Sequence, residues 1–433
     1  MLEKLINNGY ILDKLGDMAR KYEPEATFMF VGGCVRDSFL GREVHDWDVV
    51  TNADPETLHK MGLECVGQSF PVYQYMDAVI GRIEIACCRR ETKIGIGHHN
   101  GFQTEVVKSF EEDLVRRDLT INAMAWNLDR GLVSNHEHGY SDLSNKILRA
   151  TSEAFAEDPL RVFRVARFAA QFGDNWVVEE STMKMMNMLK SETETLSVER
   201  VRVELEKALM SPKPSMFFKV LRDCDCLSFW FPEVAVMTGV DHNIKWHPER
   251  DVFNHQMMVL DRGRELGFSL EEMYCALGHD FGKPLVPKET WPKMVGHEML
   301  GRTPIKDFCK RLGLGHQIEN AMLVTAELHT QVHTAFTLRP VTMVRMLSRA
   351  KRTVVGVVGF ARVCMADSQG RGEPFTNRPY PQADFVINCF EIMKSVKFDG
   401  VPNMTAQKAE TMYVKALSPF MSEQKKLHPD MKH

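Results

Sequence analysis

The chain has 433 residues, of which 44% are hydrophobic and 26% are charged, and its formal net charge at pH 7 is −4. This length provides for roughly two to four domains with cores of their own. The composition is that of an ordinary globular protein, which excludes a disordered or collagen-like chain. The sequence contains no uncharged apolar run of about 18 residues or more, so we expect no transmembrane helix.

The ten cysteines include no C-x-x-C pair, which excludes a zinc ribbon and a secreted disulfide framework. We therefore expect a reducing, cytoplasmic location, and the acidic residues near the start of the chain argue against a signal peptide. The small net charge neither favours nor excludes a nucleic-acid partner. An enzyme acting on nucleic acid would have to gather its positive charge locally, and the arginines of segments 116–117 and 161–167 are the candidate places.

Residues 1–27 are expected to form an amphipathic helical extension. A β-rich head with short helices is expected at residues 28–145. It opens with an apolar run that ends at Gly32 and Gly33, which predicts a strand, a tight turn and a short helix.

Asp46 and Asp48 follow in a valine-rich segment, where strand periodicity places both carboxylates on one face. Two adjacent carboxylates repel one another unless a cation lies between them, and hard oxygen ligands suit Mg²⁺. A glycine turn lets backbone N–H groups approach a phosphate closely. Each motif alone is more often a solvated strand edge or a plain turn, but together they predict phosphoryl or nucleotidyl transfer.

Later in the head, residues 89–104 contain glycine and histidine and are expected to form a mobile loop. Arg116 and Arg117 precede a strand-like segment at residues 120–128. Two arginines beside a strand would suit triphosphate oxygens. The alternative is a surface pair satisfied by the acidic residues 111–113, and the arginines taken alone favour that alternative.

A helical region is expected at residues 146–238. Within it, Arg161, Arg164 and Arg167 recur every third residue, which stacks guanidiniums along one stripe of a helix. Asp158 is expected to cap this helix, with the following proline at its first position. A carboxylate and a guanidinium can also present an acceptor and donors to a base edge, and capping is compatible with base reading.

Residues 239–370 are expected to be helical and are rich in histidine, and residues 371–433 are expected to form a mixed tail region. A helix-borne His–Asp pair with a distant His upstream and an Asp downstream can converge on a divalent metal. Imidazole with carboxylate suits Mn, Ni, Fe or Zn better than Mg, and metal-activated water hydrolyses phosphoesters. A single buried histidine is more often a core residue, but the repeated pattern favours a metal site. The residues of this pattern include His255, His279, Asp280 and Asp367.

The motifs GGCVRD, HDWD, RRDLTINA and EDPLRVFRVARF occur in this order, followed by KWHPERDVFNH, LGHDFGKP and ADSQGRG. Together they resemble the class II tRNA nucleotidyltransferases, the CCA-adding enzymes, and in particular the bacterial subgroup with a C-terminal HD domain. The resemblance covers roughly residues 28–380. It implies an α+β chain in which a small mixed or antiparallel β-sheet nucleotidyltransferase head is followed by an all-α, nucleotide- and tRNA-binding neck and body and by an α-helical HD domain.

The resemblance also implies roles for individual residues of the transferase. Asp46 and Asp48 match the catalytic carboxylates that bind Mg²⁺ and activate the tRNA 3′-hydroxyl. Asp158 and Arg161 match the pair that reads CTP and then ATP, and residues 89–104 resemble the loop that helps to switch specificity from C to A. The expected nucleotide-binding residues are Gly33, Arg36, Arg117, Asp158, Arg161, Arg164 and Arg167.

For the HD domain, the resemblance implies a transition metal such as Ni²⁺ or Mn²⁺. It also implies 2′,3′-cyclic phosphodiesterase, 2′-nucleotidase and phosphatase activity. His297 and His329 stand where that subgroup also has histidines. The implied metal ligands are His255, His279, Asp280 and Asp367.

Two alternatives to CCA addition are a poly(A) polymerase of the same superfamily and an HD phosphohydrolase whose head serves as an RNA-binding module. The HD domain and the lack of a long basic C-terminal extension argue against the former, and the intact Asp46 and Asp48 pair argues against the latter. The expected partners are tRNA, CTP and ATP, with no membrane, in a monomer or a homodimer. Residues 1–26 have no counterpart in the family pattern, and residues 135–140 replace a more typical Asp-Pro turn.

Overall fold

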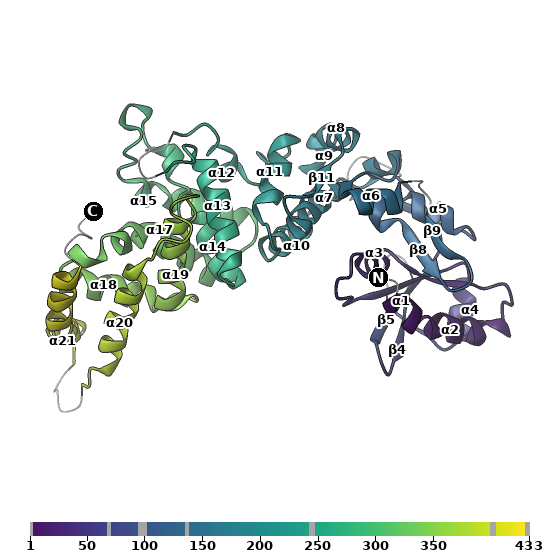
Figure 1. The fold of residues 1–433 in the computed structure, drawn as a ribbon, viewed down its shortest axis with the longest axis horizontal. Helices are drawn as coiled ribbons and strands as arrows, with labels where there is room; N and C mark the ends of the chain where they lie inside the picture. The colour runs from purple at the N-terminus through teal and green to yellow at the C-terminus, as the bar shows by residue number, and fades with distance from the viewer. Residues whose placement is uncertain are drawn as a thin grey trace. The chain divides into compact units, whose positions relative to one another are not determined.

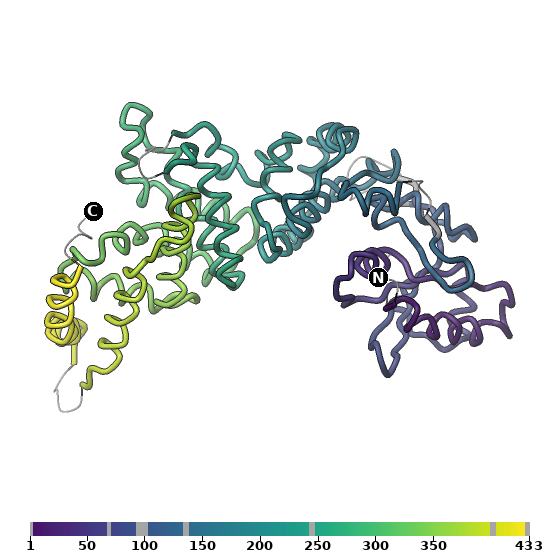
Figure 2. Tube along the Cα trace, viewed as in Figure 1, coloured from purple at the N-terminus to yellow at the C-terminus, as the bar shows by residue number. Residues whose placement is uncertain are grey.

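The computed structural model describes residues 3–66, 71–93, 102–134, 138–241, 247–398 and 404–428. Its contacts divide the chain into two compact units: an N-terminal unit of residues 1–169 and 174–196, and a C-terminal unit of residues 170–173 and 197–433. Figure 1 labels many of the helices and strands of both units, and Figure 2 traces the same chain as a tube. The finer, five-part division expected from the sequence stays a prediction.

A seven-stranded mixed sheet forms the centre of the N-terminal unit, with the strand order β3-β4-β5-β2-β1-β8-β9. Neighbouring strands are antiparallel except for β2 and β5, which run parallel. This sheet confirms the small mixed sheet expected for the head. Its strands are β1 (Phe28–Val31), β2 (Trp47–Thr51), β3 (Glu64–Cys65), β4 (Val72–Asp77), β5 (Gly81–Cys87), β8 (Met124–Asn127) and β9 (Gly131–Ser134).

The strand, turn and short helix predicted around the glycine pair are confirmed. Strand β1 is apolar and buried along its whole length, and it ends at Gly32, whose φ of 74° lies in the left-handed region that favours glycine. Helix α3 (Gly33–Phe39) begins directly after this turn. The chain then returns along β2, which pairs with β1 in antiparallel register.

The first residues of the chain form two helices, α1 (Glu3–Asn8) and α2 (Tyr10–Arg20), instead of the one amphipathic helix expected. Helix α1 lies against α3, and α2 lies against β1. Leu5, Ile11 and Leu15 are fully buried in these contacts. The N-terminal extension is therefore part of the core of the head. The other helices before residue 146 are α4 (Pro55–Lys60), α5 (Phe110–Val115) and α6 (Gly139–Asn145).

Two further segments of the head differ from the expectation. The segment expected to be strand-like begins with a 3₁₀ turn, η2 (Thr120–Asn122). The Asn122 side chain donates to Asp118, and backbone hydrogen bonds between residues three apart form the turn. Strand β8 follows. The ends of the expected loop form an antiparallel pair of strands, β6 (Arg89–Lys93) and β7 (Phe102–Val106). Its central residues, 94–101, lie outside the described residues, as do residues 135–137 of the unusual turn.

Beyond residue 146 the N-terminal unit is helical, apart from one short parallel pair of strands. The pair was not expected. Helix α7 spans the arginine stripe, and the carboxylate of Asp158 accepts the N–H of Leu160 at 3.0 Å, which confirms the predicted cap. The last residues of α7 belong to the C-terminal unit. The elements are β10 (Ile147–Leu148), η3 (Glu153–Glu157), α7 (Leu160–Phe172), β11 (Val177–Val178), α8 (Glu180–Met188) and α9 (Lys190–Thr193).

The described part of the C-terminal unit is built from helices, as expected. The segment after residue 371, expected to be mixed, forms two long helices, α20 and α21, that pack on α19 and α18 through a shared apolar core. The helices are α10 (Val198–Leu209), α11 (Ser215–Asp223), α12 (Pro232–Ala235), α13 (Val252–Glu265), α14 (Leu270–Gly278), η4 (Lys283–Leu285), η5 (Lys288–Thr290), α15 (His297–Leu300), α16 (Arg302–Arg311), α17 (His316–His333), η6 (Ala335–Thr337), α18 (Pro340–Ala350), α19 (Gly356–Gln369), α20 (Pro381–Ser395) and α21 (Ala406–Leu427).

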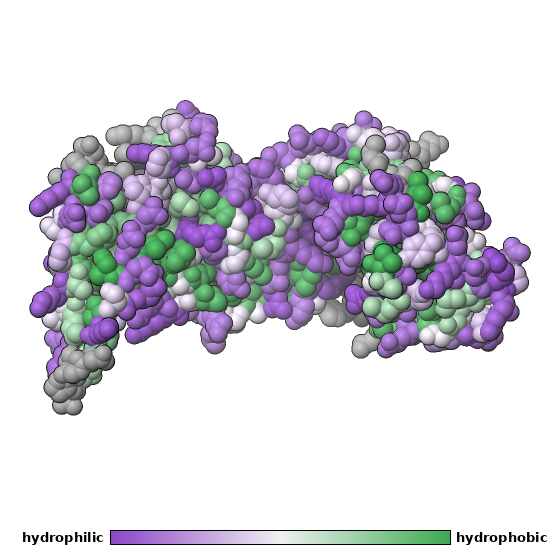
Figure 3. Space-filling model, turned by 60° about the horizontal axis from the view of Figure 1, so that its bottom comes forward, coloured by the Kyte–Doolittle hydropathy of each residue, from purple (hydrophilic) through white to green (hydrophobic). Residues whose placement is uncertain are grey.

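The surface carries its apolar residues in separate groups. On the face drawn in Figure 3, hydrophobic residues lie in several spots among hydrophilic ones. Among the described residues, no helix combines the length and the apolar character that crossing a membrane requires.

Candidate functional site

The first candidate site lies at the carboxylates that follow the glycine turn. Strand β2 begins at Trp47, so Asp46 precedes the strand and is exposed, whereas Asp48 lies within it and is partly buried. Asp48 is in register with Glu84 of the parallel neighbour β5, which places a third carboxylate beside the predicted pair. Burial, helped by the charges of Glu84 and Asp46 and opposed by Arg117, raises the pKa of Asp48 to about 6. A cation bound here would relieve this repulsion.

The turn itself brings an arginine close to these carboxylates. A Cβ atom on Gly32 would lie 3.2 Å from Nη1 of Arg117, so both the positive φ and the close approach of the guanidinium favour glycine at this position. Gly33, the predicted nucleotide contact, is the first residue of α3. Arg117 is anchored on the other side by the buried carboxylate of Asp113, at 2.9 Å.

Asp113 binds Arg116 as well, at 2.7 Å, so one member of the acidic segment 111–113 pairs with both arginines, as the alternative expected, but this acid is buried and not on the surface. Arg116 turns away toward Glu91, at 3.0 Å. The two neighbouring arginines therefore have different surroundings: Arg117 lies beside the glycine turn, and Arg116 pairs with Glu91 of β6.

Asn122 and Asp118 connect two of the predicted arginines. The Asn122 side chain accepts from Nη1 of Arg36 at 2.6 Å and donates to Asp118 at 3.0 Å. Asp118 in turn pairs with Arg164 at 2.6 Å. Although burial opposes ionisation, the charge of Arg164 and the hydrogen bond from Asn122 hold the pKa of Asp118 well below its usual range. This buried chain fixes the positions of both guanidiniums.

Phe168 on α7 is a second meeting point of the predicted arginines. The guanidinium carbons of Arg36, Arg164 and Arg167 lie 5.3, 5.7 and 4.0 Å from the centre of its ring. A ring face attracts cations, so one buried aromatic side chain holds three positive groups together.

Arg161 is more enclosed than the other members of the arginine stripe, with 7% of its surface exposed. Its terminal nitrogens donate to the backbone carbonyls of Ala154 and Arg116, the latter at 2.6 Å. Arg161 and Asp158 therefore both stand on fixed elements at the start of α7.

The second candidate site is a buried cluster of histidines and carboxylates in the C-terminal unit. Two groups of ligand atoms, each within 4.8 Å, hold the predicted ligands: His255, His279 and Asp367, and Asp280, His297 and His329; a third group, His247, Glu249 and His255, adjoins the first. Asp280 joins the first two groups, because its Oδ2 lies 3.1 Å from Nε2 of His279 and its Oδ1 lies 3.4 Å from Nε2 of His297. All four predicted ligands thus lie together, along with the two histidines named beside them.

Each histidine of the first two groups directs its Nδ1 toward a backbone carbonyl. An Nδ1–H that donates to a carbonyl puts the ring's lone pair on Nε2, the atom that a metal can bind. The acceptor carbonyls are Gly370 for His255 at 3.0 Å, Ala276 for His279 at 2.8 Å, Met294 for His297 at 2.7 Å and Ala326 for His329 at 2.9 Å. Nδ1 of His255 also lies 3.0 Å from Oε1 of Glu249, a second acceptor for the same N–H.

Several atoms at the centre of the cluster fit a cation. Nε2 of His279 and both carboxylate oxygens of Asp280 are buried and make no well-directed hydrogen bond to the described residues. The Nε2 atoms of His297 and His329 face each other at 3.2 Å, and with both rings donating at Nδ1, both carry lone pairs. A divalent transition metal suits this donor set.

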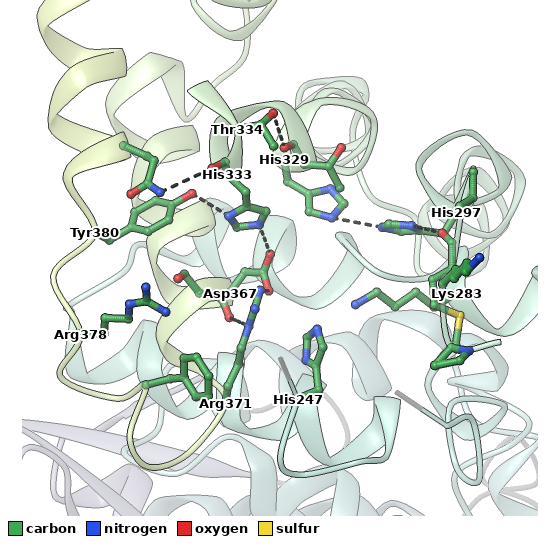
Figure 4. Close-up of a pocket in the computed structure, with 18 of the residues that line it drawn as sticks. His247, Lys283, His297, His329, His333, Thr334, Asp367, Arg371, Arg378 and Tyr380 are labelled. Carbon is green, nitrogen blue, oxygen red and sulfur yellow. Dashed lines mark hydrogen bonds and ion pairs between the residues drawn. The ribbon is translucent and has the colours of Figure 1, made fainter. Parts of the chain in front are cut away.

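A cavity of about 610 Å³ opens onto the cluster. Figure 4 shows His297, His329 and Asp367 at its wall, with Lys283 pointing into it; Arg371 and Arg378 also line it. Nζ of Lys283 lies 2.6 Å from Oδ2 of Asp280. The positive side chains suit an anionic substrate such as a phosphoester.

The sequence interpretation missed Glu84 and His333, and it gave no role at the sites to Asn122, Phe168 and Lys283. His333 follows His329 by one helical turn on α17, so the i, i+4 spacing was a usable signal. The alternating Ile83-Glu84-Ile85 pattern likewise predicts an exposed carboxylate on a strand. No local pattern points to the partner strand of Glu84, because that pairing joins distant segments.

Three family descriptions match the chain in succession. The Poly A polymerase head domain matches residues 28–149, the probable RNA and SrmB-binding site of polymerase A matches residues 177–237, and the HD domain matches residues 252–354.

Solved structures of two CCA-adding enzymes are similar in fold. The Thermotoga maritima enzyme complexed with tRNA has a TM-score of 0.64 at 20% identity, with 99% of this chain and 96% of that chain covered. The Bacillus stearothermophilus enzyme in complex with CTP has a TM-score of 0.62 at 18% identity, with 97% and 98% covered. These similarities confirm the fold class.

Relatives at higher identity cover nearly the whole chain. The multifunctional CCA protein of Acinetobacter baumannii (strain AYE) is 37% identical over 412 residues, which is 93% of this chain and 98% of the relative. That of Pseudoalteromonas atlantica is 39% identical over 380 residues, 86% of this chain and 92% of the relative. With both the transferase-like head and the histidine cluster in place, the chain belongs to the multifunctional CCA protein family.

Proposed function

We propose that this chain adds the 3′-terminal CCA to tRNA, with CTP and ATP as substrates and without a nucleic-acid template. The observation that carries the proposal is the placement of Asp48 beside Glu84 on parallel strands, next to Asp46 and within the field of Arg117. The identity of 37–39% to multifunctional CCA proteins supports the same reaction.

In this proposal, Asp46 and Asp48 hold Mg²⁺, with Glu84 as a third carboxylate of the site. Bound Mg²⁺ would neutralise triphosphate oxygens and lower the pKa of the attacking tRNA 3′-hydroxyl. The exposed Asp46 and the partly buried Asp48 supply hard oxygen ligands from one short segment. The negative charge of Glu84 disfavours the ionised form of Asp48, and a bound cation would offset this repulsion.

The chain's arginines bind and orient the nucleotide in this proposal. Their guanidiniums grip phosphate oxygens bidentately, and the anchors described above, Asn122, Asp118 and Phe168, pre-set their geometry. The proposed nucleotide-binding residues are Gly33, Arg36, Arg117, Asp158, Arg161, Arg164 and Arg167.

Asp158 and Arg161 are proposed to read the base edge in place of a template strand. The cap holds Asp158, and the carbonyls of Ala154 and Arg116 take two of the five N–H donors of Arg161. Rigid mounting of both groups favours discrimination between bases, because a misplaced donor costs a hydrogen bond.

The experiment is to incubate the protein with tRNA that lacks its 3′ end and with each nucleoside triphosphate separately and together. Two C residues followed by one A support the proposal. The head matches a family described as that of Poly A polymerase, so long A tails would support a poly(A) polymerase instead. No incorporation with phosphohydrolase activity retained would leave an HD phosphohydrolase with an RNA-binding head.

We also propose that the C-terminal unit hydrolyses phosphoesters, with 2′,3′-cyclic phosphodiesterase, 2′-nucleotidase and phosphatase activity. The convergence of the Nε2 atoms with Asp280 and Asp367 supports a metal such as Ni²⁺ or Mn²⁺ at His255, His279, Asp280 and Asp367, with His297 and His329 as further ligands. Such a metal would activate a water molecule for attack on phosphorus. Metal analysis of the purified protein, with hydrolysis of 2′,3′-cyclic AMP before and after chelation, tests this activity.

The remaining expectations are proposals of the same kind. The head (28–145) would carry the transferase carboxylates, segment 146–238 would bind nucleotide and tRNA, and segment 239–370 would carry the hydrolase. The ten cysteines are all free thiols, which suits a reducing cytoplasm. Sedimentation of the purified protein would distinguish a monomer from a homodimer.

A further inference from the structure

The two carboxylate oxygens of Asp367 have different partners. Oδ1 lies 3.0 Å from Nε2 of His255 and 3.8 Å from Nε2 of His279, so it belongs to the first metal-binding group. Oδ2 lies 2.6 Å from Nε2 of His333, which is outside both groups. Asp367 is 3% exposed, so these contacts form in a region largely shielded from water.

His333 is oriented differently from the four histidines of the two groups that hold the predicted ligands. Its Nδ1 lies 2.7 Å from the hydroxyl of Tyr380, not beside a backbone carbonyl. A distance of 2.6 Å between an imidazole nitrogen and a carboxylate oxygen is that of a hydrogen bond. Because the carboxylate supplies acceptors and the imidazole supplies the N–H, Nε2 of His333 carries the proton that Oδ2 receives.

The neutral tautomer of His333 then follows. With its proton on Nε2, the ring has its lone pair on Nδ1, where it accepts the hydroxyl proton of Tyr380. Tyr380 is 8% exposed. Figure 4 shows this chain of hydrogen bonds from Tyr380 through His333 to Asp367 along one side of the cavity. His333 thus offers a donor, and not a lone pair, to the cluster.

We propose that His333, held in this tautomer by Tyr380, is a positioning residue that binds Oδ2 of Asp367 and so reserves Oδ1 for the metal. The inference rests on the proposed metal-dependent hydrolase. A hydrogen bond to Oδ2 fixes the plane of the Asp367 carboxylate before a metal ion binds. Metal binding then costs less conformational entropy of this side chain. Both Asp367 and Tyr380 lie beyond residue 354, where the match to the HD domain ends.

Arg371 is a positively charged neighbour of Asp367, and its geometry does not fill the role of His333. Its Nη2 lies 3.4 Å from Oδ1, the oxygen that faces the metal group, while its Nε donates to the backbone carbonyl of Asp367 at 3.3 Å. These contacts leave Oδ2 to His333. Removing His333 therefore takes away the short contact of that oxygen.

The test is a titration of the metal-free full-length protein with Co²⁺, whose visible absorption reports both affinity and ligand geometry. Removal of an outer-shell partner typically weakens metal affinity about 10- to 100-fold. We expect a loss of this size for His333→Leu and a smaller loss, about threefold to tenfold, for Tyr380→Phe, with altered Co²⁺ spectra. His333→Gln, which can still donate to Oδ2, should recover much of the affinity.

Thr334→Ala is the matched control, because Thr334 is exposed, lines the same cavity and contacts none of the ligands through a hydrogen bond of the structure. It should bind Co²⁺ like the parent protein. Melting temperatures of the metal-free variants identify any variant that fails to fold, and Tyr380→Phe and His333→Gln keep the test decisive if His333→Leu does so.

The outcomes separate this inference from the hydrolase proposal. If the parent protein binds no Co²⁺ at the cluster, the proposed metal-dependent hydrolase fails. If the parent binds Co²⁺ and both Tyr380→Phe and His333→Leu bind it within twofold of the parent with unchanged spectra, the positioning role is wrong and the hydrolase proposal stands.

Discussion

Replacing Asp48 with asparagine should stabilise the metal-free protein at neutral pH while it abolishes nucleotide addition. Asp48 is partly buried and lies beside Glu84. Without a bound cation, its negative charge is disfavoured by burial and by this neighbour. An amide of the same shape removes the charge, and it also removes a ligand for Mg²⁺.

The magnitude follows from the pKa of Asp48, which burial, Glu84 and Asp46 raise to about 6 from an ordinary value near 4. The folded state therefore holds this proton more tightly than the unfolded state does, and the metal-free protein loses stability as the pH rises from about 4 to about 6. The difference corresponds to about 3 kcal/mol. Because Asp48 is partly exposed, solvent screens these interactions. We therefore expect Asp48→Asn to raise the free energy of unfolding by about 1 to 2 kcal/mol.

Calorimetry of the full chain in EDTA measures this effect. At pH 7.5 the transition of Asp48→Asn should lie about 2 to 6 °C above that of the parent, and at pH 3, below the unfolded-state pKa of Asp48, the two should nearly coincide. Asp46→Asn is the matched control, because Asp46 is exposed; its transition should move by about 1 °C or less. Both variants should lose CCA addition in Mg²⁺.

An unchanged or lower transition temperature for Asp48→Asn at pH 7.5 would refute this reasoning. So would an equal gain at pH 3, since Asp48 is then protonated in both states and its charge is not the cause.

Three further predictions concern other parts of the two units. Phe168→Leu removes the ring that three guanidiniums contact, so KM for CTP and ATP should rise about tenfold; an unchanged KM with only a lower melting temperature would make the ring purely structural. Leu15→Ala opens a cavity beneath α2 and should cost about 2 to 5 kcal/mol, seen by calorimetry; no change would mean that the extension is not part of the core. Asp280→Asn should abolish hydrolysis of 2′,3′-cyclic AMP and leave CCA addition intact, and loss of both would show that the sites are not independent.

Local features of the fold were predictable from the sequence. The glycine turn, the strand carrying Asp48 and the cap of α7 each depend on residues within a few positions of one another. The turn, β2 and the cap agree with the structure. The break between α1 and α2 and the 3₁₀ turn at Asn122 were missed, because tertiary packing and side-chain hydrogen bonds override helix and strand propensity there.

The pattern of histidines and aspartates also indicated which residues converge in the C-terminal unit. It did not indicate that their ligand atoms form separate groups. The position of Asp280 between two groups depends on the packing of several helices. The same holds for Tyr380, which reaches His333 across 47 positions of the chain. Pairings of this kind follow from tertiary structure, and no periodicity in the sequence encodes them.

The backbone carbonyls that receive the Nδ1 protons bear on how this protein can change over evolutionary time. Any residue that keeps its helix supplies the same carbonyl, so substitutions at Ala276 or Ala326 that pack without strain would leave the orientation of the ring intact. The orientation of His333 has no such tolerance, since it relies on the hydroxyl of one particular side chain. Nδ1 of His255 has a side-chain partner as well, Oε1 of Glu249 at 3.0 Å. Among the described imidazoles of this cluster, a single substitution at Tyr380 or Glu249 can therefore change a ring's surroundings and retune the metal centre.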